Sequence, residues 1–264
     1  MPAHDDDQSY YTDAGDGTYL PTVHAQGAWS EHEQHLAPVS GLLTHLIERH
    51  EPREGLRVAR VTLEALGVIH AEPSTVRTRT VRPGRTIELV EAVMSSRGRD
   101  VVRASAWRLV RGDTAGIAAT EDEPMPGPDG LGDSEVMVKR WGGGYISSIE
   151  VRYADARPGR GRAWLRTGVG LVAGQDSSPT ARLLGLVDTA NGLVVRESPQ
   201  EWMFPNTDLT IHLHREPVGE WLGLDVSVSF GPDGIGMTAA VLHDVTGPFG
   251  RSQQILTIRP QPGV

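Results

Sequence analysis

The chain has 264 residues, of which 38% are hydrophobic and 22% charged, so it is long enough for one large globular domain or two of about 130 residues each. Its formal net charge of −9 argues against general nucleic-acid binding, because such proteins neutralise phosphates with a basic surface. The absence of cysteine excludes disulfides, thiolate nucleophiles and Cys-based metal sites.

The N-terminal residues 1–16 include the acidic run His4-Asp5-Asp6-Asp7 and little apolar content. They predict a disordered, solvated tail. The start of the chain lacks the apolar core of a signal peptide, and no later stretch approaches the roughly 18 apolar residues of a membrane span. We therefore expect a cytoplasmic protein without a membrane span.

The next region predicts one helix followed by four strands. Apolar residues with helical spacing run from Pro38 to Glu48, and Pro38 suits the first turn. Segments rich in β-branched residues follow, at 57–69, 75–81, 86–95 and 101–110. This order indicates an α+β unit in which an antiparallel sheet wraps around one helix.

The same order returns after a segment rich in proline, glycine and acidic residues. Strands are expected at 145–153 and 162–168, then a helix from Pro179 to Val195 capped by Ser178. Four more strands follow at 207–214, 220–230, 234–242 and 252–259. We therefore predict a tail (1–16), a first module (17–119), a linker (120–137) and a second module (138–264).

Asp188 is the most informative polar residue, because it falls within the second predicted helix and borders its buried stripe. Such a carboxylate suits a general base, although an outward-facing Asp188 fits the position equally well. Gln254 lies in the last predicted strand, on one face with Leu256 and Ile258. A buried amide there would bind a water, or form a structural hydrogen bond.

Two further groups have weaker signals. Asn206-Thr207-Asp208 opens the strand after the helix and offers an amide and a hydroxyl, although such a triplet is more typical of a turn. His212 and His214 alternate along that strand, but no third ligand with metal-site spacing accompanies them. We find no nucleophile elbow, phosphate-binding loop or dinucleotide fingerprint, and we expect no metal or cofactor.

Several of these segments resemble the double hot-dog acyl-CoA thioesterases related to bacterial thioesterase II. In the second half the likeness rests on residues 181–188, Asn206-Thr207-Asp208, Leu213-His214-Arg215, Glu220-Trp221 and Gln254. In the first half it rests on Trp29, Gln34-His35, Pro38 and the turn at 82–85. The resemblance implies two tandem hot-dog modules and hydrolysis of acyl-CoA or a related acyl thioester.

In that family a helix aspartate, a threonine at the start of the following strand and a last-strand glutamine orient the hydrolytic water. Asp188 and Gln254 match two of them, so the resemblance implies catalytic roles for both. Asn206 stands in the threonine's place with Thr207 beside it, so either Asn206 completes the catalytic set or Thr207 does. We assign Asn206 to catalysis and Thr207 to substrate binding.

The first module lacks these residues, since Ala106 or Trp107 stands where Gln254 stands in the second, and we expect a degenerate half. Leu36-Ala37 also replaces two glycines of the family before the first helix. A non-catalytic module that binds acyl-CoA or another acyl ligand is the main alternative. A hot-dog hydratase is disfavoured because the second helix has no histidine. A homo-oligomer is compatible with this fold class.

Overall fold

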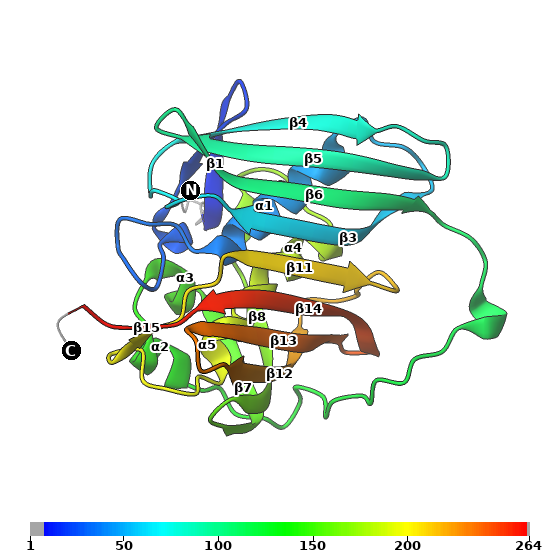
Figure 1. Cartoon of the computed structure of the whole chain (residues 1–264). Helices are drawn as coiled ribbons and strands as arrows, with labels where there is room; N and C mark the ends of the chain where they lie inside the picture. The colour runs from blue at the N-terminus through cyan, green and yellow to red at the C-terminus, as the bar shows by residue number, and fades with distance from the viewer. Residues whose placement is uncertain (1–7, 263–264) are drawn as a thin grey trace, which may run out of the picture.

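The computed structural model describes residues 8–262, which form one large curved sheet around two central helices (Figure 1). The helices are α1 (Leu36–Arg49), α2 (Val136–Arg140), α3 (Gly144–Ser147), α4 (Pro179–Val187) and α5 (Ala190–Leu193). The strands are β1 (Ser9–Gly15), β2 (Thr18–Pro21), β3 (Leu56–Ala65), β4 (Ser74–Arg82), β5 (Ile87–Ser96), β6 (Arg99–Val110), β7 (Ile149–Arg157), β8 (Arg160–Thr167), β9 (Gly170–Val172), β10 (Trp202–Met203), β11 (Asp208–Leu213), β12 (Leu222–Phe230), β13 (Ile235–Asp244), β14 (Gly247–Thr257) and β15 (Arg259–Pro260).

The main sheet has the order β7-β8-β12-β13-β14-β11-β3-β6-β5-β4-β2-β1-β9. All of its described neighbours are antiparallel except β1 and β9. The two halves of the chain join in the middle, where β11 pairs with β3 and Thr210 lies opposite Thr62. Strands from both halves therefore form one continuous sheet.

The central helices α1 and α4 pack against each other inside the sheet's curvature (Figure 1). Both begin at a polar N-cap: His35 Nδ1 accepts a hydrogen bond from Ala37 N, and Ser178 Oγ accepts one from Ala181 N. Such caps satisfy backbone donors that have no partner within the helix. Pro179 occupies the first turn of α4, as the sequence predicts. The cap positions matter because the pocket described below lies beside the N-terminus of α1.

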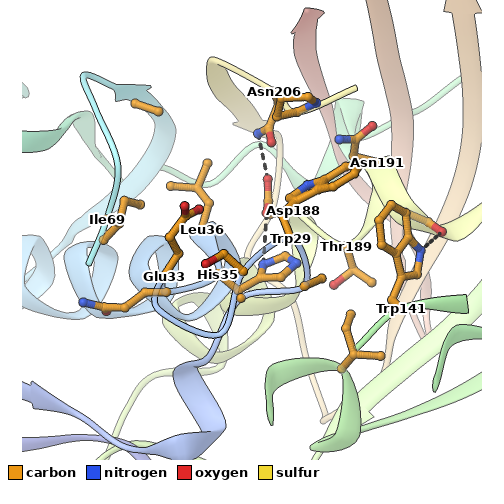
Figure 2. Close-up of a pocket in the computed structure, with 18 of the residues that line it drawn as sticks. Trp29, Glu33, His35, Leu36, Ile69, Trp141, Asp188, Thr189, Asn191 and Asn206 are labelled. Atoms are coloured by element: carbon orange, nitrogen blue, oxygen red, sulfur yellow. Dashed lines mark hydrogen bonds and ion pairs between the residues drawn. The ribbon is translucent and has the colours of Figure 1, made fainter. Parts of the chain in front are cut away.

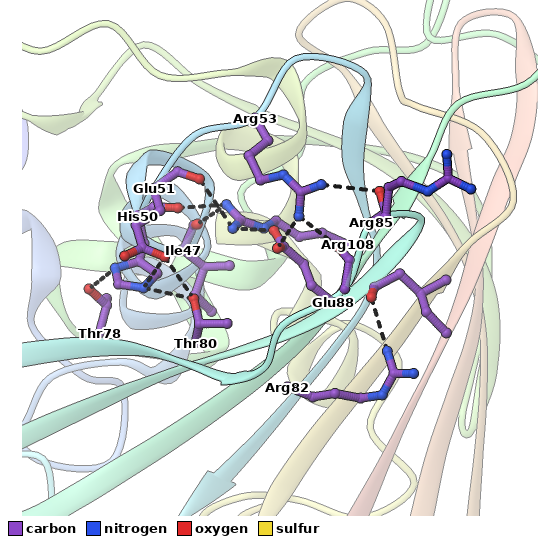
Figure 3. A network of polar contacts seen from close by, with 12 residues as sticks. Ile47, His50, Glu51, Arg53, Thr78, Thr80, Arg82, Arg85, Glu88 and Arg108 are labelled. Carbon is purple, nitrogen blue, oxygen red and sulfur yellow. Dashed lines mark hydrogen bonds and ion pairs between the residues drawn. The ribbon is translucent and has the colours of Figure 1, made fainter.

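The C-terminal end of α1 is held by a buried ion pair (Figure 3). Arg108 of β6 donates to the carbonyl oxygens of Ile47 (3.1 Å) and His50 (2.7 Å), and its guanidinium pairs with Glu88 of β5. Arg53 donates a second charged hydrogen bond to Glu88 at 2.9 Å. Arg108 thus satisfies carbonyls at the end of α1 that lack helical partners.

Three predictions about local structure are wrong. The tail predicted over 1–16 is ordered from Ser9 onward, because Tyr10 and Tyr11 of β1 are buried and β1 pairs with β2 and β9; residues 1–7 lie outside the described range. The helix predicted to Val195 ends at Val187. It continues only as a tight turn and the short α5, in a stretch that contains Asn191 and Gly192, which are weak helix formers.

The third error concerns the segment before β7, where a strand was expected from Tyr145. Gly144–Ser147 instead form α3, and β7 begins at Ile149. Gly143 has φ +97°, and a Cβ on Gly144 would lie 1.8 Å from the carbonyl oxygen of Val23. These glycines therefore permit a close approach to the N-terminal loop, which local sequence patterns cannot reveal.

Candidate active site

A pocket of about 390 Å³ lies between the N-terminus of α1, the loop after β3 and the segment that follows α4 (Figure 2). Its walls come from both halves of the chain. The apolar side includes Trp29, Ile69, Met137, Trp141 and Ile146, and the polar side includes His35, Asp188, Thr189 and Asn206. A mostly apolar cavity with a few convergent polar groups is the usual form of a small-molecule site.

Asp188 is buried, and it occupies the C-cap position of α4 rather than the interior of a longer helix. Three side chains surround its carboxylate. Asn206 Nδ2 donates to Oδ1 at 2.8 Å, and Gln254 Nε2 donates to the same oxygen at 2.6 Å. His35 Nδ1 lies 3.2 Å from Oδ2. Hydrogen bonds from the two amides replace water that a buried carboxylate gives up.

Gln254 reaches Asp188 from β14, where it lies opposite Thr238 of β13 and is 1% exposed. Its amide orientation is fixed, because the reverse orientation would bring Oε1 against the carboxylate. Gln254 Oε1 is buried and has no hydrogen-bond partner among the described residues. A buried amide oxygen without a partner costs about 1–3 kcal/mol, so it favours a bound hydrogen-bond donor at this point.

The structure separates Asn206 from Thr207. Asn206 forms an isolated bridge with Leu256 and lines the pocket, and its Nδ2 also donates to Asp208 O at 3.0 Å. Thr207 is exposed and is not part of the pocket wall. The structure therefore brings Asp188, Asn206 and Gln254 together, and it does not bring Thr207 to them.

His35 is the pocket residue that sequence reasoning missed as a site residue. Its ring stacks on Tyr145 with centroids 4.3 Å apart, and it caps α1 through the hydrogen bond from Ala37 N at 3.1 Å. The predicted helix starts at Pro38, three residues after His35, so the sequence pattern does not indicate that His35 caps it. The contact of His35 with Asp188 joins segments 153 positions apart, and no local pattern encodes such a contact.

Tyr145 contacts His35 and Thr189, two residues that line the pocket, and its hydroxyl oxygen lies 2.6 Å from that of Thr189. Complete burial raises the pKa of the Tyr145 phenol well above its usual value, and the nearby Asp188 charge acts in the same direction. Tyr145 is consequently neutral at physiological pH.

Trp29 and Trp141 line the apolar side of the pocket, and Phe204 packs against both of them. Trp29 meets Trp141 edge-on with centroids 4.8 Å apart and meets Phe204 at 5.4 Å. Trp141 Nε1 donates to Gly192 O at 3.0 Å, which fixes this ring against the segment after α4. Edge-to-face contacts of this kind hold rings in defined positions. These contacts fix the positions of the two tryptophan rings that line the pocket.

Within residues 8–262, no group of three acidic or histidine side chains is arranged to hold a metal ion. Over the same range, none of the helices has the length and apolar character needed to cross a membrane.

Comparisons with known proteins agree with this architecture. The acyl-CoA thioesterase N-terminal domain matches residues 25–109, and the acyl-CoA thioesterase C-terminal domain matches residues 119–258. No curated protein sequence matches the chain.

Solved structures share the fold at low sequence identity. A hot-dog protein of unknown function from Alicyclobacillus acidocaldarius superimposes with a TM-score of 0.74 at 14% identity, covering 96% of this chain and 97% of that one. An acyl-CoA thioesterase II from Mycobacterium marinum has a TM-score of 0.65 at 15% identity, covering 96% of each chain. With both of its domains matched, the chain belongs to the acyl-CoA thioesterase family and is a thioester hydrolase.

Proposed function

We propose that the protein hydrolyses acyl-CoA, or a related acyl thioester, with Asp188 as the general base. The observation that carries this proposal is the convergence of Asn206, Gln254 and His35 on one buried carboxylate. An ionised carboxylate offers about four lone-pair positions. Asn206 and Gln254 occupy two on Oδ1, and a proton on His35 Nδ1 would occupy one on Oδ2. The remaining position is free to accept a hydrogen bond from water.

Gln254 would orient that water, because its unpartnered Oε1 accepts the second hydrogen of the molecule that Asp188 holds. The water oxygen then attacks the thioester carbon and its proton passes to Asp188. The C–S bond breaks, and the thiolate leaves without strong acid assistance because thiols have a pKa of about 8.5. Backbone N–H groups at the N-terminus of α1, beside the pocket, would stabilise the oxyanion.

We further propose that this site belongs to the second of two tandem hot-dog modules, spanning residues 17–119 and 138–264 with a linker at 120–137. The residues of the first half that correspond to Asp188 and Gln254 support the proposal that the first module is degenerate. His45 lies ten residues after the cap of α1 (45 − 35), as Asp188 lies ten after the cap of α4 (188 − 178). His45 is buried and bonded to Gln175 at 3.0 Å. Ala106 lies in β6 and offers no side-chain hydrogen bond.

The test is release of free CoA from acyl-CoAs of several chain lengths by the wild type and by Asp188→Asn. Positioned base catalysis contributes about 10²–10⁴-fold, so we expect turnover to fall at least about a hundredfold while the unfolding midpoint changes little. Equilibrium binding of the same acyl-CoAs should persist in the variant. Near-normal turnover in Asp188→Asn would remove Asp188 from the base role, and binding without hydrolysis by the wild type would contradict the proposed reaction.

A further inference from the structure

One ring nitrogen of His35 faces two incompatible partners. Nδ1 lies 3.1 Å from the backbone nitrogen of Ala37, which can only donate, and 3.2 Å from Oδ2 of Asp188 (Figure 2). To accept from Ala37, Nδ1 must carry a lone pair. To bond an ionised carboxylate, the same nitrogen must carry a proton. The two hydrogen bonds therefore exclude each other for as long as Asp188 is ionised.

The position of the His35 proton affects both the general base Asp188 and the oxyanion site at the N-terminus of α1. With the proton on Nδ1, His35 donates to Asp188 and the Ala37 N–H is released at the N-terminus of α1, where the helix dipole favours negative charge. With the proton on Nε2 alone, the single lone pair of Nδ1 accepts from Ala37 N, and Nδ1 has no proton to offer the ionised Oδ2. In that state the Nδ1–Oδ2 contact is favourable only if Asp188 itself is protonated, and a protonated acid cannot serve as a base.

We propose that His35 is a positioning residue that works with its proton on Nδ1, and that this single proton couples the base to the oxyanion site. The Nδ1 proton holds Oδ2 of Asp188 in place by a hydrogen bond. Because Nδ1 then has no lone pair to offer Ala37, the Ala37 N–H is free to bind the thioester oxygen. Asp188 accepts the proton from water at its remaining lone-pair position, and the thiolate that leaves takes this proton up, so His35 keeps its proton on Nδ1 throughout the cycle.

The surroundings of His35 support this assignment. Tyr145 from α3 stacks on the ring and stays neutral through burial. Glu33, two residues before His35 in the sequence, also lines the pocket. Asp188 from α4 is the carboxylate in direct contact with Nδ1. A charged hydrogen-bond partner normally decides which ring nitrogen of a histidine holds the proton.

This inference rests on the proposed function, but its first test does not depend on activity. ¹⁵N NMR of the histidine-labelled protein distinguishes protonated from unprotonated ring nitrogens, and the His35 signals are those missing from His35→Asn. We expect a protonated Nδ1 and an unprotonated Nε2 in the wild type. In Asp188→Ala the proton should move to Nε2, because Ala37 becomes the remaining partner. A wild-type Nε2–H tautomer, or no change in Asp188→Ala, would overturn the proposal.

The second test is kinetic and uses His35→Asn, since asparagine is among the best helix caps. Its Oδ1 takes the place of Nδ1 and accepts from Ala37 N, so the helix cap survives while the Ala37 N–H stays blocked and Oδ2 of Asp188 loses its donor. Loss of one oxyanion donor costs about 10²–10³-fold, so we expect kcat to fall by about that factor with little change in KM. Full activity in His35→Asn would contradict the coupling even if Asp188→Asn is inactive, which separates this proposal from the base assignment.

Discussion

Gly41 of α1 and Gly185 of α4 pack directly against each other, so closely that a Cβ on Gly41 would lie 3.0 Å from the Cα of Gly185 and 3.2 Å from the carbonyl oxygen of Ala181. The helix separation set by this contact places the N-terminus of α1 beside the end of α4. His35 and Asp188 are thereby within reach of each other, although they come from different halves of the chain.

The variant Gly41→Ala should lower both stability and activity. Alanine favours a helix over glycine by about 0.5–1 kcal/mol, but the added methyl group must push two backbones apart, which costs about 1–3 kcal/mol. We expect a lower urea midpoint and reduced kcat. Gly116→Ala is the control, because a Cβ there meets no atom within 4 Å; equal behaviour of the two variants would contradict the packing argument.

Asn206→Ala and Thr207→Ala should differ sharply, although the positions are adjacent. Asn206 donates to the Asp188 carboxylate, and hydrogen bonds to charged groups are worth about 1.5–3 kcal/mol. We therefore expect kcat/KM to fall by about 10–100-fold in Asn206→Ala. Thr207 is exposed, so its variant should stay within about twofold of the wild type, since exposed substitutions change free energies by about 0.5 kcal/mol or less. A larger loss in Thr207→Ala would restore this residue to the site.

Trp29→Ala should change the substrate preference rather than the chemistry. Trp29 lines the pocket and meets Trp141 and Phe204 edge-on, so its removal widens the apolar side without touching Asp188. We expect kcat/KM for long acyl chains to rise relative to short ones. The control is Trp221→Ala, because Trp221 packs beneath the guanidinium groups of Arg152 and Arg166 away from the pocket. An unchanged chain-length profile in Trp29→Ala would place the acyl group elsewhere.

Glu88→Gln should destabilise the fold by about 3–5 kcal/mol, because it leaves the buried guanidinium of Arg108 without its counter-charge. The matched control is Glu64→Gln, whose partner Arg103 forms an exposed pair that solvent screens, so this variant should unfold close to the wild-type midpoint. Chemical unfolding of both variants measures the difference. Equal midpoints would show that the buried pair adds nothing beyond a surface pair.

Asp244 should make stability depend on pH in the acid range. Burial acts to raise its pKa, but hydrogen bonds from Arg215, Thr246 and backbone N–H groups outweigh burial and lower the pKa from 3.8 to about 2. A carboxyl group with a lowered pKa stabilises the fold above its unfolded-state value, and this contribution is lost as the pH falls from about 4 to about 2. Wild type and Asp244→Asn should therefore converge in urea midpoint over that interval. Parallel curves would contradict this assignment.

The spacing of apolar residues and the helix caps in the sequence predict the positions of the two central helices, α1 and α4. The apolar spacing after Pro38 located α1, and Ser178 with Pro179 located the start of α4. These predictions succeed because helix caps and amphipathic stripes are local properties of the chain. The resemblance to acyl-CoA thioesterases likewise identified the family that both matched domains show.

Only the tertiary structure decided which polar groups meet. Tyr10 and Tyr11 order the N-terminal strand because distant strands bury them, and α4 ends at Val187, so Asp188 caps it. The position of His35 beside Asp188 follows from the glycine contact between two helices far apart in sequence. Contacts between distant segments depend on packing and not on local propensity, so no sequence pattern could place His35 beside Asp188 or exclude Thr207 from the pocket wall.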